Sequence, residues 1–261
     1  MSSDTPNILA TYQRILEQQG YKPTTVYQRI RLLGHLGVSP DQATRADVLR
    51  VMDMAHKSSS RRVYLNGLKI AYRDLLELGL VEHDPTIGLR SPAPPRGKPR
   101  PLTAVEIAKL LNLTGRELSW TILGLRAGLR AAEVTRVKPA DLQMTDQGWV
   151  LHIPVGKGGG WGTIPAHPDV VDILQPLAGY DRALWPIRPA RLSVAWTEAA
   201  EGVGVTGRRF HDLRHTFASQ VYAQTGDLYV TQQLMRHASI ATTTIYAQPD
   251  QGRQFQAVAG L

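Results

Sequence analysis

Hydrophobic residues recur every three to four positions through the first 90 residues, which is the pattern of amphipathic helices. In the first of these helices, one face carries Ile8, Tyr12, Ile15 and Leu16. Gly20 follows this stripe and supplies a stop signal. The same spacing predicts four helices, over residues 7–20, 22–37, 44–55 and 58–80. We therefore expect the amino-terminal part of the chain to fold as a small all-helical bundle.

Two of the predicted helices begin with a capping-box sequence. Thr44 precedes Asp47 by three residues, an arrangement in which each side chain bonds the other residue's backbone amide. Thr103 and Glu106 repeat that spacing at the start of residues 101–111. The second box predicts that a new helical domain begins there.

The hydrophobic pattern changes its period over residues 149–165. Alternating hydrophobic and polar residues lead into a glycine cluster, and a second short strand then follows. This predicts a β-hairpin with Lys157 at its tip. Helical patterns flank the hairpin on both sides, with an interruption at Gly128 and a stop at Pro139. The expected fold class is mainly α: a helical bundle, then a mixed, mostly α domain with a small β-hairpin or sheet.

A proline-rich segment separates the two helical patterns. Its five prolines and one glycine cannot continue a helix or a central strand. We predict three parts: a helical domain at 1–90, a linker at 91–101 and a second domain at 102–261. Proline keeps such a linker extended. Its basic residues Arg96, Lys98 and Arg100 would then lie along a path suited to a nucleic-acid backbone, with a merely solvated linker as the alternative.

The composition is that of a globular, positively charged protein. Hydrophobic residues make up 43% of the chain and charged residues 20%. The net charge of +8 favours a polyphosphate partner without separating DNA from RNA or an anionic membrane. The absence of cysteine excludes disulfides, thiolate metal sites and cysteine nucleophiles. The chain shows neither a long apolar run nor a signal-peptide pattern at its start, so we expect a cytoplasmic protein with no membrane span.

Three basic residues, Lys57, Arg61 and Arg62, cluster at the amino end of the fourth predicted helix. The helix dipole disfavours cations at that end, so an external anion is a reasonable partner for them. A solvated helix face is the alternative. Together with the basic linker residues, they are candidates for DNA binding.

The densest group of reactive side chains lies in HDLRHTFASQVYAQ, residues 211–224. His211, Arg214 and His215 are spaced three and four apart, which places them on one face of a helix. Two histidines at this spacing could bind zinc. However, a metalloprotease motif requires glutamate where Asp212 stands, and Arg214 would repel a cation. The glycine-rich hairpin also lacks the spacing of a nucleotide-binding loop. We therefore expect no metal site and no cofactor.

Four segments occur in the second domain in this order: AGLRAAEVTRVKPADL, GKGGG, HDLRHTFAS and LMRHASIATTTIYAQ. Their residues and spacing resemble the active-site motifs of the tyrosine recombinases, the phage integrase family. The resemblance covers residues 102–246 in detail, and the amino-terminal bundle is more loosely similar to the family's core-binding domain. It implies these catalytic residues: Arg130 and Arg214 as the arginine pair, His211 and His237 as the histidines, Lys157 as the hairpin lysine and Tyr246 as the nucleophile.

The residue types suit chemistry on a phosphodiester. Two permanently charged guanidiniums can bind the oxygens of a phosphate that gains charge under attack. A tyrosine hydroxyl has a reference pKa of about 10 and needs a base, so His211 or a neighbouring group could accept its proton. Glu133, one turn after Arg130, could orient that arginine, with an ordinary helix ion pair as the alternative. The resemblance implies that Lys157 protonates the leaving 5′ oxygen and that His237 bonds the phosphate.

The resemblance implies a site-specific recombinase that cuts and rejoins double-stranded DNA through a 3′-phosphotyrosine intermediate. It also implies a homotetramer on DNA, with the tail after Tyr246 exchanged between subunits. That tail carries Phe255, Val258 and Leu261 three residues apart. A type IB topoisomerase-like strand transferase, a non-catalytic DNA-binding regulator and a histidine-zinc hydrolase are the alternatives. Arg236 stands where the family usually has glycine, and the sequence leaves open whether it packs behind the site or contacts phosphate.

Overall fold

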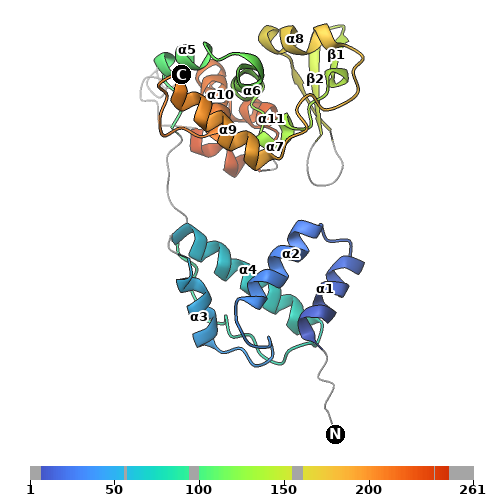
Figure 1. Cartoon of the computed structure of the whole chain (residues 1–261), viewed down its shortest axis with the longest axis vertical. Coiled ribbons are helices and arrows are strands. Elements are labelled where there is room, and N and C mark those ends of the chain that lie inside the picture. The colour runs from blue at the N-terminus through green and yellow to red at the C-terminus, as the bar shows by residue number, and fades with distance from the viewer. Residues whose placement is uncertain (1–6, 56–57, 94–99, 155–160, 238, 247–261) are drawn as a thin grey trace, which may run out of the picture. The chain divides into compact units, whose positions relative to one another are not determined.

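The computed structural model describes residues 7–55, 58–93, 100–154, 161–237 and 239–246 of the 261-residue chain. The chain divides into two compact units, Met1–Gly97 and Lys98–Leu261, and both are mainly helical (Figure 1). The second unit also contains a small antiparallel sheet, so the expected fold class is confirmed. Within the described ranges, no helix has both the length and the apolar character needed to cross a bilayer.

Four helices form the amino-terminal unit: α1 Ile8–Gln18, α2 Pro23–Gly34, α3 Arg45–Asp53 and α4 Ser58–Glu77. Tyr12 and Leu65 are fully buried in the core that these helices share. Gly67 allows α2 and α4 to approach closely, because a β-carbon at this position would lie 2.4 Å from Leu32 Cδ1. The predicted four-helix pattern is therefore confirmed, with ends a few residues shorter than expected.

Both predicted capping boxes are present. The backbone amide of Thr44 donates to Asp47 Oδ2 at 3.0 Å at the start of α3. The amide of Thr103 donates to Glu106 Oε2 at 2.8 Å at the start of α5, Ala104–Leu110. In each case the threonine hydroxyl accepts from the acidic residue's amide, so local sequence alone sets where these helices begin.

A polar network joins three helices of the amino-terminal unit. The hydroxyl of Tyr12 on α1 donates to Asp74 Oδ2 on α4 at 2.9 Å. Arg29 on α2 donates to the same hydroxyl at 3.1 Å and also forms an ion pair with Asp74. Because each polar atom has a partner, the network can lie inside the unit without a large desolvation penalty.

The carboxyl-terminal unit consists of seven α-helices and a sheet among its described residues. Its helices are α5 Ala104–Leu110, α6 Gly115–Arg126, α7 Ala131–Val134, α8 Pro168–Leu174, α9 Pro189–Gly202, α10 Phe210–Thr225 and α11 Leu228–Met235. The buried rings of Trp196 and Phe210 meet edge to face, with their centroids 5.8 Å apart. The indole of Trp196 donates to Thr121 Oγ1 at 2.9 Å, so the core joins α6, α9 and α10.

Two glycines set the distance between α6 and α10. A β-carbon at Gly124 would lie 2.8 Å from Leu213 Cδ1 and 2.9 Å from Leu213 Cβ. Gly128 has a φ of 59°, in the left-handed region, and a β-carbon there would lie 2.5 Å from the ring of Phe217. The predicted interruption at Gly128 is thus a turn that ends α6 and starts the segment leading to α7.

The sheet contains three antiparallel strands in the order β1 Leu142–Thr145, β2 Gly148–Pro154 and β3 Trp161–Pro165. Leu151 in the central strand pairs with Leu142 on one side and Ile164 on the other. In Figure 1 the strands and α8 lie on one side of this unit, away from α9 and α10. The predicted β2–β3 hairpin is confirmed, whereas β1 was not predicted. Lys157, expected at the hairpin tip, lies outside the described residues.

Candidate active site

Helix α10 presents the predicted histidine and arginine cluster. Asp212 accepts from the backbone amide of Arg209 at 2.8 Å and so caps the start of this helix. Gly226, with a φ of 67°, ends the helix in the left-handed conformation. Between these limits His211 and His215 lie one turn apart, and their rings meet edge to face with centroids 4.8 Å apart.

Arg214 is held inside the site by backbone carbonyl groups. Its side chain is 1% exposed. Its two terminal nitrogens donate to the carbonyl oxygens of Gly128 and Met235. The first carbonyl belongs to the turn after α6 and the second to the end of α11. One arginine therefore joins three segments that are far apart in the sequence.

Arg130 stands at the start of α7, where it remains 41% exposed. Its Nη1 donates to Glu133 Oε1 at 2.7 Å, and its backbone amide donates to Glu133 Oε2 at 2.9 Å. Glu133 thus fixes both the backbone and the side chain of Arg130. Because the guanidinium keeps an exposed face, it can still meet a ligand.

Arg236 occupies an unusual backbone position. Its φ is 53°, in the left-handed region. Among the residues that the structure describes, no other non-glycine residue has a positive φ. Its side chain is 5% exposed, and Nη2 donates to Glu133 Oε2 at 3.0 Å. The sequence left two roles open for Arg236. Its burial and its bond to Glu133 place it behind the site, packed against the turn that carries Arg130.

Three guanidiniums surround the single carboxylate of Glu133. Arg214 Nη1 lies 3.9 Å from Oε2, which also accepts from Arg236. Burial acts to raise the pKa of Glu133, but the charge of Arg236, the hydrogen bond from the Arg130 amide and the charge of Arg214 outweigh it. The pKa of Glu133 is therefore below its usual value. One carboxylate against three cations leaves an excess of positive charge, which favours an anionic ligand.

The electrostatics also act on Arg214 itself. Burial, followed by the charges of Arg130 and Arg236, lowers the pKa of Arg214 to about 9. The guanidinium is still charged at neutral pH. It is a cation with little water around it, so its attraction to an entering phosphate is weakly screened.

His237 is oriented by the connection that follows it. Its Nδ1 lies 2.8 Å from the hydroxyl of Thr243, and Thr243 is fully buried. Burial, then the charges of Arg214 and Arg130, lowers the pKa of His237 to about 4. The ring is therefore neutral at pH 7. Its other nitrogen can serve as a hydrogen-bond donor when Nδ1 accepts from Thr243.

Tyr246 lies in a short 3₁₀ turn, Thr244–Tyr246, and is 6% exposed. Its ring belongs to a small buried cluster with Ala218 of α10 and Met235 of α11. Its hydroxyl lies 2.7 Å from His215 Nδ1. Burial raises the pKa of Tyr246, against the opposing charges of Arg214 and Arg130. The neutral phenol is thus favoured, and the hydroxyl needs a base if it is to react.

His215 is the residue of this site that sequence reasoning missed. The spacing on α10 put it beside His211 and Arg214, but nothing in the sequence indicated a contact with Tyr246, 31 residues later. Partial desolvation lowers the pKa of His215 and Arg214 acts in the same direction, while Asp212 opposes them. The pKa of His211 is lowered by desolvation and then by His215 and Arg214. Both rings are therefore neutral at pH 7.

Some of the predicted site residues lie together in the structure, and others lie outside the described residues. It brings Arg130, Arg214, His211, His237 and Tyr246 into one site. Lys157 and, among the candidate DNA-binding residues, Lys57, Arg96 and Lys98 lie outside the described residues.

The described candidates for DNA binding have partners within their own units. Arg61 donates to the carbonyl of Ala55 at 3.1 Å and pairs with Asp53 at 3.3 Å. Arg62 donates to the carbonyl of Pro92 at 3.4 Å. The side chain of Arg100 is exposed, and its carbonyl accepts from Arg208. None of these bonds tests a role in DNA binding.

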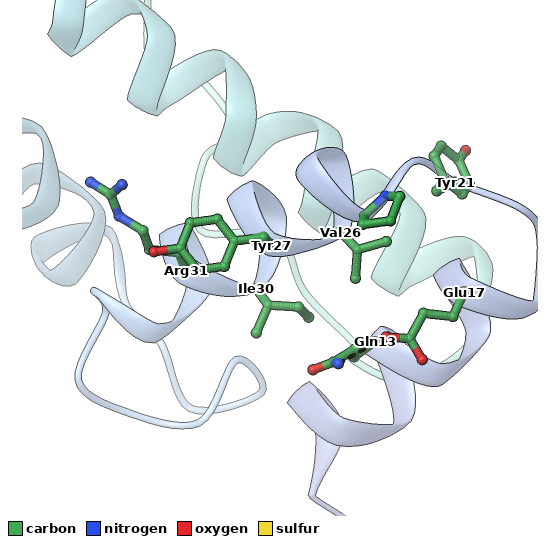
Figure 2. A pocket seen from close by; sticks show the side chains of 8 residues that line it. Gln13, Glu17, Tyr21, Val26, Tyr27, Ile30 and Arg31 are labelled. Carbon is green, nitrogen blue, oxygen red and sulfur yellow. Dashed lines mark hydrogen bonds between the residues drawn. The ribbon is translucent and has the colours of Figure 1, made fainter. Parts of the chain in front are cut away.

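A groove of about 540 Å³ lies between α1 and α2 of the amino-terminal unit (Figure 2). Tyr27, Ile30 and Arg31 line it on the α2 side, and Gln13 and Glu17 on the α1 side. The amide of Gln13 donates to Glu17 at 2.9 Å. These residues form no nucleophile–base pair, unlike the cluster around Tyr246. No group of three or more His, Asp or Glu that could hold a metal occurs among the described residues.

Comparisons with known proteins identify the family and the fold. The family model described as "Phage integrase family" matches residues 102–253. The tyrosine recombinase XerC of Pseudomonas putida is 31% identical over 239 residues, which cover 82% of this chain and 79% of the relative. XerC of Mesorhizobium japonicum is 29% identical over 259 residues, covering 85% and 81%. Among solved structures, a lambda integrase dimer bound to a COC' core site is 19% identical, with a TM-score of 0.74 over 94% of this chain and 77% of that chain.

Proposed function

Because the chain belongs to the phage integrase family and is a tyrosine-type site-specific DNA recombinase, we propose that Tyr246 is its nucleophile. The observation that carries this assignment is the contact of its hydroxyl with a neutral histidine, beside two arginines whose charges act on it. Attack by Tyr246 on a DNA phosphodiester forms a 3′-phosphotyrosine bond and releases a 5′ hydroxyl. A 5′ hydroxyl from another strand can then reverse the reaction, so no energy source is required.

Arg130 and Arg214 are proposed to bind the non-bridging oxygens of the attacked phosphate. Both guanidiniums are fixed by bonds that do not involve a ligand, to Glu133 in one case and to two carbonyl groups in the other. Charge that develops on the phosphate therefore meets donors that need little rearrangement. This is the effect expected to contribute most to the rate.

His237 and His211 complete the phosphate-binding group in this proposal. His237 is neutral and oriented by Thr243, so it can donate a hydrogen bond to a phosphate oxygen. His211 stands at the start of α10, beside His215. Lys157 is proposed as the acid that protonates the leaving 5′ oxygen, on the resemblance alone. Replacing that oxygen by sulfur, which needs no proton, should restore cleavage by Lys157→Ala.

We propose that double-stranded DNA is the partner and that the amino-terminal unit is a core-type DNA-binding domain. The net charge of +8 supports a polyanionic partner. Arg61, Arg62 and Arg100 are described candidates for phosphate contacts, together with Lys57, Arg96 and Lys98. Lambda integrase has been solved as a dimer on a core site and as a tetramer on a Holliday junction. By analogy, we propose a homotetramer with exchanged carboxyl-terminal tails, acting in the cytoplasm.

A suicide substrate tests the nucleophile. Duplexes are taken from the DNA that flanks the gene and nicked near the cleavage point, so that the released strand diffuses away and the covalent adduct accumulates. The wild type should give an adduct on denaturing gels, and Tyr246→Phe should bind the same duplex without forming one. Tyr229→Phe, at an exposed tyrosine of α11, is the matched control and should react normally. An adduct formed by Tyr246→Phe would show that another residue attacks.

A further inference from the structure

Among the described residues, one histidine offers a base to the hydroxyl of Tyr246. The hydroxyl of Tyr246 lies 2.7 Å from His215 Nδ1, within ordinary hydrogen-bond distance. No such bond joins this hydroxyl to His211 or His237 in the described site. His237 Nδ1 instead bonds Thr243, six residues along the same segment. The geometry therefore separates the three histidines by role.

We propose that His215 is a catalytic residue that accepts the proton of Tyr246 as the hydroxyl attacks DNA. This inference rests on the proposed role of Tyr246. In the step, a bond forms between Tyr246 Oη and phosphorus, the bond from phosphorus to the 5′ oxygen breaks, and the hydroxyl proton moves to His215 Nδ1. The leaving 5′ oxygen takes a proton from a separate acid, for which the sequence offers Lys157. On rejoining, both protons return.

The surroundings keep His215 in the form that can accept a proton. The titratable and charged groups around its ring are His211, Asp212 and Arg214 on α10 and Tyr246 in the facing 3₁₀ turn. Asp212 favours the imidazolium that forms during the reaction, whereas desolvation and Arg214 favour the neutral ring beforehand. These opposing influences give a base that is unprotonated at neutral pH and yet can hold a proton briefly.

The position of His215 on the helix also fixes its direction. Arg214, its neighbour in sequence, is bonded to the carbonyls of Gly128 and Met235, so this turn of α10 cannot rotate freely. Tyr246 belongs to the same buried cluster as Ala218, which lies one turn further along this helix. The base therefore stands on a fixed turn of α10, and the ring of Tyr246 is buried in the 3₁₀ turn beside it, which keeps the hydroxyl within reach of Nδ1.

The test measures single-turnover cleavage of a suicide substrate whose 5′ bridging oxygen is replaced by sulfur. The leaving group then needs no proton, so the rate reports the tyrosine side of the reaction. His215→Asn keeps a hydrogen-bond acceptor near the Nδ1 position but cannot take a proton. We expect cleavage to fall by about 10²–10⁴-fold, the usual range for losing a general base. DNA binding and the melting temperature should stay near wild type.

Two further measurements separate proton transfer from positioning. The wild-type rate should decline in acid as the imidazole protonates, and the decline should lie below the ordinary histidine pKa of about 6.5, because desolvation lowers the pKa of His215. His215→Asn should lack that decline, and its slow rate should increase with pH as hydroxide takes over. In His215→Ala, added imidazole should restore part of the rate. His167→Asn is the matched control, because asparagine can replace the histidine that caps α8.

Each outcome bears on one assignment. Wild-type cleavage by His215→Asn, or no recovery of His215→Ala with imidazole, overturns the role of His215 while leaving Tyr246 as the nucleophile. An adduct on a residue other than Tyr246 overturns the proposed function instead. If His215→Ala does not fold, the pH profile of His215→Asn still decides.

Discussion

Arg236 Nη2 donates to Glu133 Oε2 at 3.0 Å, and the other oxygen of that carboxylate accepts from Arg130 at 2.7 Å. A residue in a left-handed backbone conformation is thus joined, through one carboxylate, to an arginine proposed to bind phosphate. The backbone conformation costs a non-glycine residue about 1–2 kcal/mol. The ion pair gives a reason for arginine at a position where glycine would be less strained.

We predict that Arg236→Gly slows cleavage about tenfold or more and also lowers the free energy of unfolding, because losing one partner of a buried ion pair costs more than the relief of backbone strain returns. Glycine relieves the backbone strain, but it leaves the buried Glu133 with one fewer cation and frees it to pull Arg130 from its place. The cleavage rate of Arg236→Lys should lie between those of wild type and Arg236→Gly, since lysine keeps the charge without the forked donors. Single-turnover rates and melting temperatures should be measured together. Undiminished cleavage by the glycine variant would mean that Arg236 has no positioning role.

Arg214→Lys is expected to reduce cleavage by about 10²–10³-fold, the cost of losing a fixed donor to a developing oxyanion. A lysine ammonium cannot reach the two carbonyls that the terminal nitrogens of Arg214 now bond. Arg126→Lys is the matched control, because Arg126 at the end of α6 forms a partly exposed ion pair with Asp169 of α8. The loss should appear in the cleavage rate measured at saturating protein. A loss confined to DNA affinity would contradict it.

Gly124→Ala should destabilise the carboxyl-terminal unit by about 1–3 kcal/mol, because the new methyl group would overlap Leu213 on α10. Rotating the leucine side chain cannot relieve the contact, since its Cβ lies only 2.9 Å away. Gly202→Ala, at the end of α9, is the control, since a β-carbon there meets nothing within 4 Å. In urea unfolding, the midpoint of Gly124→Ala should fall below that of wild type, whereas the midpoint of Gly202→Ala should rise or stay unchanged. Equal stabilities would show that α6 and α10 pack less closely than described.

Protonation of His237 should make the unit less stable in acid. Its pKa is about 4 in the folded chain, against about 6.5 for an unperturbed histidine. Between these values the unfolded chain binds the proton and the folded chain does not. The contribution of the neutral His237 ring to the stability of the fold is therefore complete above about pH 6.5, and it is lost as the pH falls toward 4. Melting temperatures from pH 7.5 to 5 should fall less steeply for His237→Asn than for wild type, and identical slopes would contradict this.

Much of the fold could be predicted from the sequence because its signals are local. The capping boxes at Thr44 and Thr103 lie within single turns. The hydrophobic stripe on α1 can be recognised from the spacing of residues within that one helix. Strand β1 was missed because it has four residues and one buried side chain, Leu142, so it shows no alternation. It is recognisable only through its pairing with β2.

The sequence motifs identified residues of the candidate site, but they did not identify the contacts between those residues. The residues Arg130, Arg214, His211 and His237 stand in recognisable segments of the sequence. The contacts between segments could not be predicted, because the contact from His215 to Tyr246 and the bond from Arg236 to Glu133 span 31 and 103 positions. These contacts depend on how α10, α11 and the turn after α6 pack, which no single segment encodes.

The covalent bond between Tyr246 and DNA is the central claim, and the sequence allows a direct measurement of it. Trypsin cleaves after Arg236 and Arg253, so residues 237–253 form one peptide, in which Tyr246 is the single tyrosine. The adduct from a suicide substrate is digested with nuclease and trypsin and analysed by mass spectrometry. The account predicts this peptide with a nucleotide attached to Tyr246 through a 3′ phosphate. A nucleotide attached to any other residue, with this peptide unmodified, would contradict it.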